Sequence, residues 1–97
     1  MTKANRTRLG KKIVLRMTGI RLLISVQHLD AGFSTQQLYV HSQVDFIFGE
    51  LRFEGFGTTP NYFRIKVEEI MNIKEFDIER YEITMKDGTV IILQKHF

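Results

Sequence analysis

The 97-residue chain is long enough for one domain with its own hydrophobic core. It is 43% hydrophobic and 26% charged, which excludes general disorder, and it has no cysteine, which excludes disulfides and thiolate metal sites. The net charge of +3 combines two opposite parts: residues 1–21 carry seven Lys and Arg and no acid, whereas all eleven acidic residues follow from Asp30 onward. A basic segment joined to an acidic body predicts an anionic partner.

The sequence also bears on the membrane and on the cell compartment. No stretch approaches the run of about 18 apolar residues that crosses a bilayer. The basic start is not followed by the continuous apolar region of a secretory signal. We therefore expect a cytoplasmic protein without a membrane partner.

Residues 1–10 have no apolar periodicity and predict a flexible basic N-terminal arm that ends at Gly10. We expect residues 11–97 to form a single β-rich domain. In residues 11–18, Ile13, Leu15 and Met17 alternate with their neighbours, which predicts a half-buried strand. A clearer alternation runs over residues 20–29 and stops at a turn over residues 30–32.

The middle of the chain contains one ambiguous segment and one long β pattern. Residues 33–43 fit a short helix, because Ser34 and Gln37 have capping-box spacing, or a strand, which we favour. Residues 44–54 alternate in two parities that switch at Gly49, which predicts a bulge or a tight turn. A loop over residues 55–61, a strand over 62–67 and a helical turn within 68–78 complete this part.

The C-terminal segment predicts a β-hairpin, because Asp87-Gly88 separates two β-type runs. A three-residue loop with Gly88 in the left-handed conformation places Ile83 opposite Ile91 and gathers the apolar side chains on one face.

The whole pattern predicts a mainly β fold: a small single-domain antiparallel barrel or curved sheet with at most one or two short helices. The expected core consists of Ile13, Leu15, Leu22, Ile24, Val26, Phe46, Phe48, Leu51, Phe53, Phe63, Ile65, Val67, Ile83, Ile91 and Leu93.

The function we expect is a small non-enzymatic binding or regulatory module that engages an anionic partner, most simply nucleic acid, through its basic N-terminal segment. Lys and Arg hold phosphates by charge and by release of counterions. No helix-turn-helix, zinc-finger or other family motif is present. The candidate nucleic-acid-binding residues are Lys3, Arg6, Arg8, Lys11, Lys12, Arg16, Arg21, Arg64 and Lys66.

Two other functions stay open. The first is a protein-interaction or inhibitory accessory module that acts through a sheet edge or through the 55–61 loop, with Phe56 and Tyr62 as contact residues. The second is a small-ligand binder, for example of a nucleotide, with a pocket between subunits. Unpaired strand edges also predict a homodimer.

Catalysis and cofactor binding find little support in the sequence. The histidines, His28, His41 and His96, have no metal-ligand spacing, and the carboxylates are scattered. We expect no enzyme activity, no metal and no cofactor.

Overall fold

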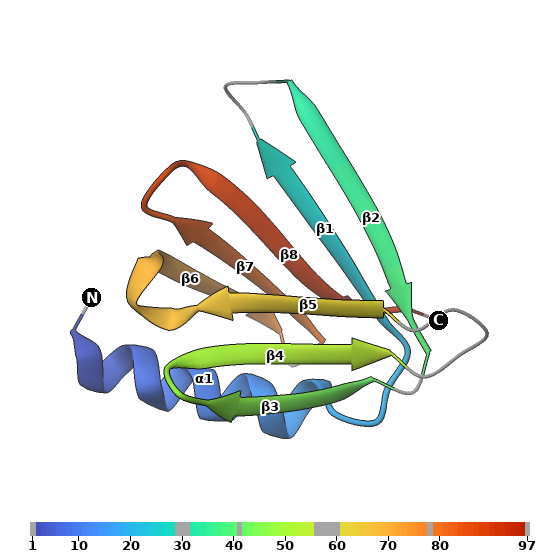
Figure 1. The fold of residues 1–97 in the computed structure, drawn as a ribbon, viewed down its shortest axis with the longest axis horizontal. Coiled ribbons are helices and arrows are strands. Elements are labelled where there is room, and N and C mark those ends of the chain that lie inside the picture. Colours follow the sequence, from blue (N-terminus) through green and yellow to red (C-terminus); the bar gives the residue numbers. More distant parts are fainter. Residues whose placement is uncertain (1, 29–31, 41, 56–60, 78, 97) are drawn as a thin grey trace.

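The computed structural model describes residues 2–28, 32–40, 42–55, 61–77 and 79–96 (Figure 1). In chain order these residues form helix α1 (Lys3–Met17), strands β1 (Leu22–His28), β2 (Phe33–Tyr39), β3 (Gln43–Ile47), β4 (Glu50–Gly55) and β5 (Asn61–Lys66), the 3₁₀ turn η1 (Val67–Glu69), and strands β6 (Ile70–Asp77), β7 (Arg80–Met85) and β8 (Thr89–Lys95).

The strands form two antiparallel sheets, so the expected mainly β fold is confirmed. The large sheet has the order β2-β1-β8-β7-β6 and the small sheet has the order β3-β4-β5. The sheets stay separate and do not close into the barrel that we considered. They pack face to face, and α1 runs along one side of the pair (Figure 1). The expected homodimer stays a prediction.

The core lies where α1 and the two sheets meet. Buried apolar side chains alternate along β1, β7 and β8 of the large sheet and along β4 of the small sheet, as period-two patterning requires. Ile13 and Met17 of α1 complete the cluster. Most of the expected core residues belong to it or pack against it, and the core also contains Met17, Tyr39, Val44, Ile70 and Tyr81.

The N-terminal expectation was wrong, because Lys3–Met17 is one helix rather than a flexible arm followed by a strand. Thr2 caps this helix by accepting a hydrogen bond from the Asn5 backbone N–H at 3.2 Å. Ile13 and Met17, four residues apart, share its buried face. Leu15 lies between them in sequence and points away from them in a helix, so it is 83% exposed instead of buried.

Phe48 is the second exception to the expected core. The parity switch at Gly49 is a hairpin turn, in which Phe48 and Gly49 connect Ile47 to its paired residue Glu50. Phe48 has φ +52° and Gly49 has φ +73°. A residue at the tip of a two-residue turn has no opposing sheet to pack on, and the Phe48 side chain is 87% exposed.

The C-terminal hairpin is confirmed with its register. Tyr81 pairs with Leu93 and Ile83 pairs with Ile91. Gly88 has φ +90°, and its backbone N–H donates to the Met85 carbonyl at 3.1 Å. Strand β2 resolves the ambiguity over residues 33–43 in favour of a strand. The helical turn expected within residues 68–78 is largely wrong, because η1 covers only Val67–Glu69 and Ile70–Asp77 forms strand β6.

Gly10 lets the small sheet approach α1 closely. A Cβ atom added at Gly10 would lie 2.6 Å from Phe46 Cε2 and 2.7 Å from Phe46 Cδ2, so the ring of this β3 residue packs directly on the helix backbone. Glycine in a helix interior costs about 1 kcal/mol relative to alanine. The close contact explains why a glycine stands in the middle of α1.

We therefore expect Gly10→Ala to destabilise the protein by about 1–2 kcal/mol, because the clash with Phe46 outweighs the gain in helix propensity. In a Phe46→Val background, which lacks the two clashing atoms, the same change should become stabilising. Urea unfolding of the wild type, the two single variants and the double variant measures both effects. Asn5→Ala, at an exposed position of α1, reports helix propensity alone. A stabilising Gly10→Ala in the wild-type background would contradict the packing argument.

Candidate nucleic-acid interface and inter-sheet cleft

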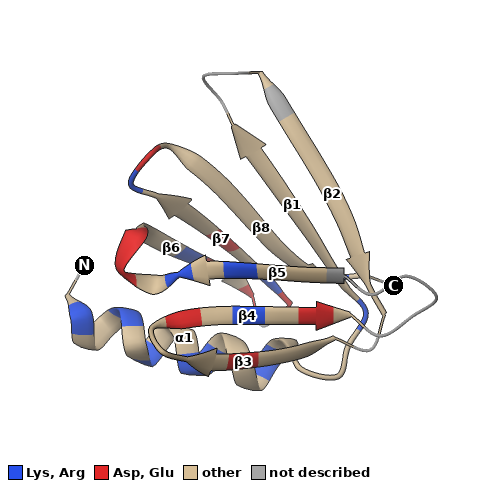
Figure 2. Cartoon of the chain, in the orientation of Figure 1, with Lys and Arg blue, Asp and Glu red and all other residues tan. Residues whose placement is uncertain are grey.

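Helix α1 gathers most of the expected phosphate-binding residues. It contains six Lys and Arg and no acidic residue (Figure 2). The helix has an inner face, with Gly10, Ile13 and Met17, and an outer face toward solvent. The six cations fall into two groups, one half-buried against the protein and one exposed to solvent.

The first group attaches α1 to the large sheet. Arg6 Nε donates to the Ile70 carbonyl at 3.1 Å, and Lys12 Nζ forms an ion pair with Glu75 Oε2 at 2.8 Å. Both partners lie on β6. Arg16 lines a small surface pocket with Ile20, Glu79 and Lys95. All three cations are half-buried. Arg6 and Lys12 bind β6 directly, whereas Arg16 acts on Glu75 of β6 through its charge.

The second group points to solvent. Lys3, Arg8 and Lys11 are exposed, and in the described part of the chain none of them forms an ion pair or a side-chain hydrogen bond. They border a shallow depression whose remaining lining residues are the small Ala4 and Thr7. We call these five residues the outer α1 surface. It is a cationic patch on a helix that the core holds in place.

A deeper cavity of about 520 Å³ separates the first turns of α1 from the β3–β4 turn. It contains two cations, Lys3 and Arg6, and one acid, Glu68. Gly49 contributes the turn side of the cavity. Cations in the first turn of a helix oppose the positive end of the helix dipole, and α1 has no acidic residue there to compensate. The charged residues that line the cavity are therefore two cations and one acid, Glu68, which gives the lining a net positive charge.

The remaining expected cations do not join α1 in one patch. Arg21 is exposed just before β1, and its carbonyl accepts a backbone hydrogen bond from His96 at 2.8 Å. Arg64 and Lys66 are exposed residues of β5.

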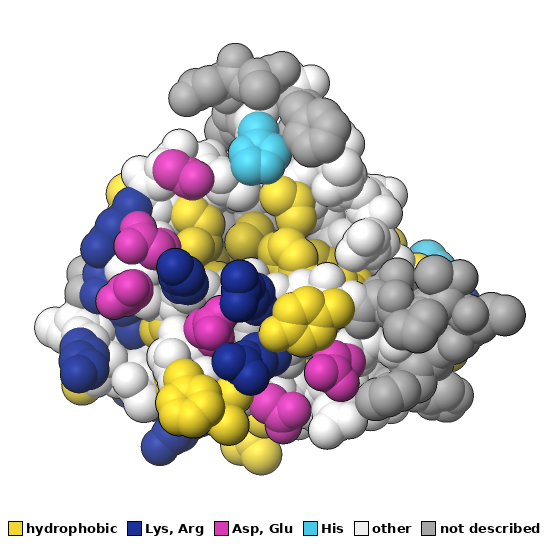
Figure 3. Space-filling view, in the orientation of Figure 1, with side chains coloured by type: hydrophobic (Ala, Val, Ile, Leu, Met, Phe, Trp, Pro, Cys, Tyr) yellow, Lys and Arg dark blue, Asp and Glu magenta, His cyan; other side chains and the backbone are white. Residues whose placement is uncertain are grey.

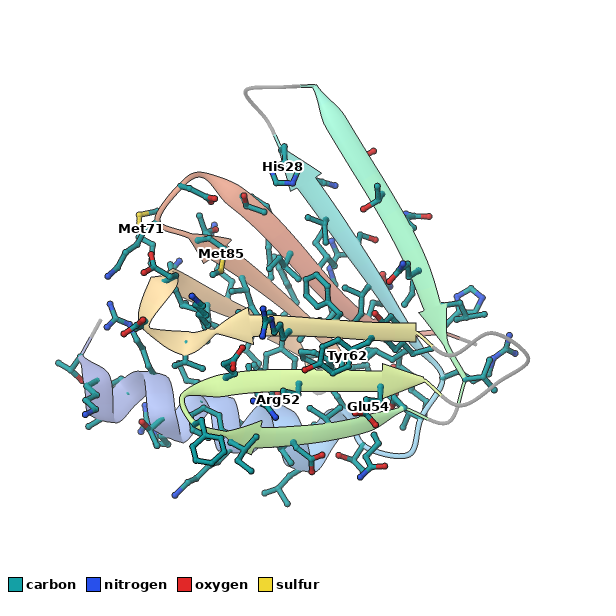
Figure 4. The ribbon with its side chains drawn as sticks, in the orientation of Figure 1. His28, Arg52, Glu54, Tyr62, Met71 and Met85 are labelled. Atoms are coloured by element: carbon teal, nitrogen blue, oxygen red, sulfur yellow. The ribbon has the colours of Figure 1, made fainter. Side chains whose placement is uncertain are left out.

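The outer face of the small sheet is close to neutral. Arg64 stands opposite Arg52 across the β4–β5 pair, and Glu50 lies 3.3 Å from Arg52 Nη2 and 3.6 Å from Arg64 Nε. Asp45 and Glu54 balance the rest of this face, where Figure 4 shows Arg52, Glu54 and Tyr62. Sequence reasoning named Arg64 but missed Glu50 and Arg52, which the alternation of β4 places beside it. This face is therefore a weaker anion site than α1.

Of the two residues expected to contact a protein partner, the structure describes only Tyr62. Tyr62 is 53% exposed on the outer face of the small sheet (Figure 4). Phe56 lies outside the described residues, as does most of the 55–61 loop.

A cleft of about 380 Å³ opens between the large sheet and β5. Its apolar lining comes from both sheets, and cationic side chains stand at its rim (Figure 3). His28 at the end of β1 and Met85 at the end of β7 both line the cleft from the large sheet (Figure 4). The lining residues are Val26, His28, Phe63, Arg64, Ile65, Lys66, Glu69, Met85, Lys86, Asp87, Thr89 and Ile91.

Hydrogen bonds order the upper rim of this cleft. The Thr89 backbone N–H donates to Asp87 Oδ1 at 2.9 Å, and Thr89 Oγ1 lies 3.2 Å from His28 Nδ1. The hydrogen bond from the Thr89 backbone, followed by that from its hydroxyl, lowers the pKa of Asp87. Asp87 therefore stays ionised. The cleft lining combines the two acids Asp87 and Glu69 with the three cations Arg64, Lys66 and Lys86.

The described residues contain no helix that is long and apolar enough to cross a membrane. Within the same residues, no group of three His, Asp or Glu side chains is arranged to hold a metal ion.

The Lys12–Glu75 ion pair yields a prediction about pH. The hydrogen bond from Lys12 is the main cause of the lowered pKa of Glu75. In Lys12→Gln we expect this pKa to rise toward the ordinary value of 4.5, as measured by NMR titration of the Glu75 carboxyl carbon. Because the folded-state pKa is lowered, the ion pair stabilises the fold above pH 4.5 and loses this effect as the pH falls through the lowered pKa. An unchanged pKa of Glu75 in Lys12→Gln would contradict the pairing. Lys11→Gln, which removes a neighbouring exposed cation, is the control and should leave this pKa nearly unchanged.

A comparison of the chain with family models, with curated proteins and with solved structures finds no significant match, so geometry and chemistry carry the functional argument.

Proposed function

We propose that this protein is a non-enzymatic nucleic-acid-binding module whose outer α1 surface contacts the phosphate backbone. The observation that carries the proposal is the division of cations on α1. Arg6 and Lys12 bind β6 directly, and the half-buried Arg16 acts on Glu75 of β6 through its charge. Lys3, Arg8 and Lys11 stay available.

A polyanion suits the outer α1 surface better than a single small anion. The three available cations are spread over the first nine residues of the helix and do not converge on one point. The phosphates of a nucleic acid recur along the strand, so they can meet cations spaced in this way. The small side chains of Ala4 and Thr7 leave room for the phosphate backbone of a nucleic acid to approach the helix closely.

Binding of this kind is electrostatic and does not read sequence. Phosphate contacts position a protein on a nucleic acid, whereas base contacts specify the site. Each phosphate neutralised on a duplex contributes about 0.9 to the negative slope of log K against log salt concentration. Three cations therefore give a slope of about −2.7 from the outer α1 surface.

The test compares two double variants with equal loss of charge. Arg8→Gln/Lys11→Gln removes two cations of the outer α1 surface. Arg21→Gln/Lys74→Gln removes two exposed cations elsewhere. Fluorescence polarisation on a short labelled duplex across a salt series should show that the first variant loses about 1.8 of the slope and that the control keeps most of it. Equal slopes in the two variants, or salt-independent binding by the wild type, would rule out the outer α1 surface as the contact.

The inter-sheet cleft favours a second candidate function, the binding of a small anionic ligand with an apolar or aromatic part, such as a mononucleotide. The cleft combines an apolar lining, which includes Phe63, with Lys66 and Lys86 at the rim. Ligand sites commonly pair apolar walls with a few charged groups in this way. The cleft lies within one chain, whereas the sequence-based hypothesis placed the pocket between subunits.

A ligand in this cleft would raise the melting temperature, because it binds only the folded protein. We expect a nucleoside monophosphate at millimolar concentration to give such a rise, measured by differential scanning fluorimetry. Lys66→Gln/Lys86→Gln should abolish the rise, and Lys74→Gln should preserve it. Stabilisation that survives loss of both rim lysines would place the ligand elsewhere.

A further inference from the structure

Phe48 is unfavourable for the fold in two respects. It exposes 87% of its surface, so it gains little from burial. It also occupies the first position of a two-residue hairpin turn with φ +52°, where Asn, Asp or Gly is favoured and a bulky side chain is strained. Residues held in such conformations gather at functional sites. The stability of the domain therefore does not explain why a phenylalanine stands at position 48.

The position of Phe48 relative to α1 is fixed by contacts on both sides of the turn. Before the turn, the Phe46 ring packs on Gly10. After it, the Gly49 carbonyl accepts a hydrogen bond from the Val67 backbone N–H at 2.9 Å. The hairpin tip therefore projects from the protein as a rigid element.

Strand β3 runs toward the N-terminal end of α1. Its start lies near the C-terminal end of the helix, because Thr18 Oγ1 donates to the Val44 carbonyl at 3.4 Å. Phe46 reaches Gly10, and Gly49 lines the same cavity as Lys3 and Arg6. Figure 1 shows the β3–β4 turn and the N-terminus of α1 at the same end of the molecule. The turn that carries Phe48 thus adjoins the cations of the first helical turns.

An exposed aromatic ring next to fixed cations is the combination that binds single-stranded nucleic acid. Bases stack on aromatic side chains while Lys and Arg follow the phosphates. A duplex offers the same phosphates, but its bases are already stacked on one another. A ring at the hairpin tip can therefore distinguish a single strand from a duplex, which the cations alone cannot do.

We propose that Phe48 is a base-stacking residue for single-stranded nucleic acid whose phosphates follow the outer α1 surface, beginning at Lys3. This inference rests on the proposed function and adds strand selectivity to it. The Phe48 ring receives one unstacked base, and the chain of phosphates continues across the first turns of the helix.

The decisive variant is Phe48→Asn, because Asn suits the left-handed turn conformation. Its melting temperature should rise by roughly 4 °C, since the strain of the turn is relieved. Its affinity for a labelled oligo(dT) strand should fall about tenfold through loss of stacking. Its affinity for a hairpin duplex should stay unchanged. The variant thus becomes more stable and binds a single strand less well, a result that unfolding cannot imitate.

Two matched variants separate stacking from apolar contact. Phe48→Tyr keeps an aromatic face and should retain oligo(dT) affinity within about twofold, whereas Phe48→Leu keeps apolar surface without a ring and should lose affinity as Phe48→Asn does. Full oligo(dT) affinity in Phe48→Leu or in Phe48→Asn would overturn the proposal. So would an equal loss of oligo(dT) and duplex binding in Phe48→Asn.

Separate outcomes identify which proposal fails. A normal salt slope with no effect of Phe48 overturns the stacking role and leaves the proposed function intact. Absence of binding to both nucleic acids overturns both. Anionic phosphatidylserine vesicles serve as the competing partner, because cations beside an apolar tip also suit a lipid surface. Vesicle binding that depends on Phe48, with no dependence of oligo(dT) binding on it, overturns the stacking role in favour of a membrane contact.

Discussion

The contact between the Phe46 ring and the Gly10 backbone determines how closely helix α1 packs against the small sheet. A helix with any side chain at position 10 would have to stand further from β3, or the ring would have to leave its place in the core. With glycine there, α1 lies between the edge of the small sheet and β6 of the large sheet, where Arg6 and Lys12 find their partners. The position of α1 in turn sets which of its cations point outward.

This arrangement divides a basic segment into structural and available charges. A composition count cannot make that division, because seven cations in 21 residues look equivalent in the sequence. The acceptors on β6, the Ile70 carbonyl and the Glu75 carboxylate, are more than 60 residues away along the chain. Only the fold reveals that two of the six helical cations, Arg6 and Lys12, already have partners on the large sheet.

The sequence predicted the β part of the fold well, because period-two patterns and turn chemistry are local signals. The Asp87-Gly88 turn determines its own register, and Gly49 marks the hairpin turn between β3 and β4. The N-terminal segment was misread because Ile13, Leu15 and Met17 match a strand at every second residue, while Ile13 and Met17 alone also match a helix. The helix packs through contacts with residues far along the chain, such as Phe46 on Gly10, and these contacts have no local signature.

The candidate site was predictable in its charge but not in its geometry. Lys3, Arg8 and Lys11 were identified as cations from composition. Phe48 was assigned to the core because it shares the parity of Val44 and Phe46, and only the turn geometry moves it outward. The inter-sheet cleft depends on how far the small sheet covers the large one, which alternation along single strands does not encode.

The absence of acidic residues from α1 also has a consequence for the order of folding. Arg8 and Lys12 lie four residues apart, as do Lys12 and Arg16, so the isolated helix repels itself, and Gly10 weakens it further. The carboxylate that relieves this repulsion lies on β6, which the ribosome produces some 60 residues later. We therefore expect α1 to become ordered only after β6 has been synthesised, so that its positive charges stay exposed on the nascent chain until then.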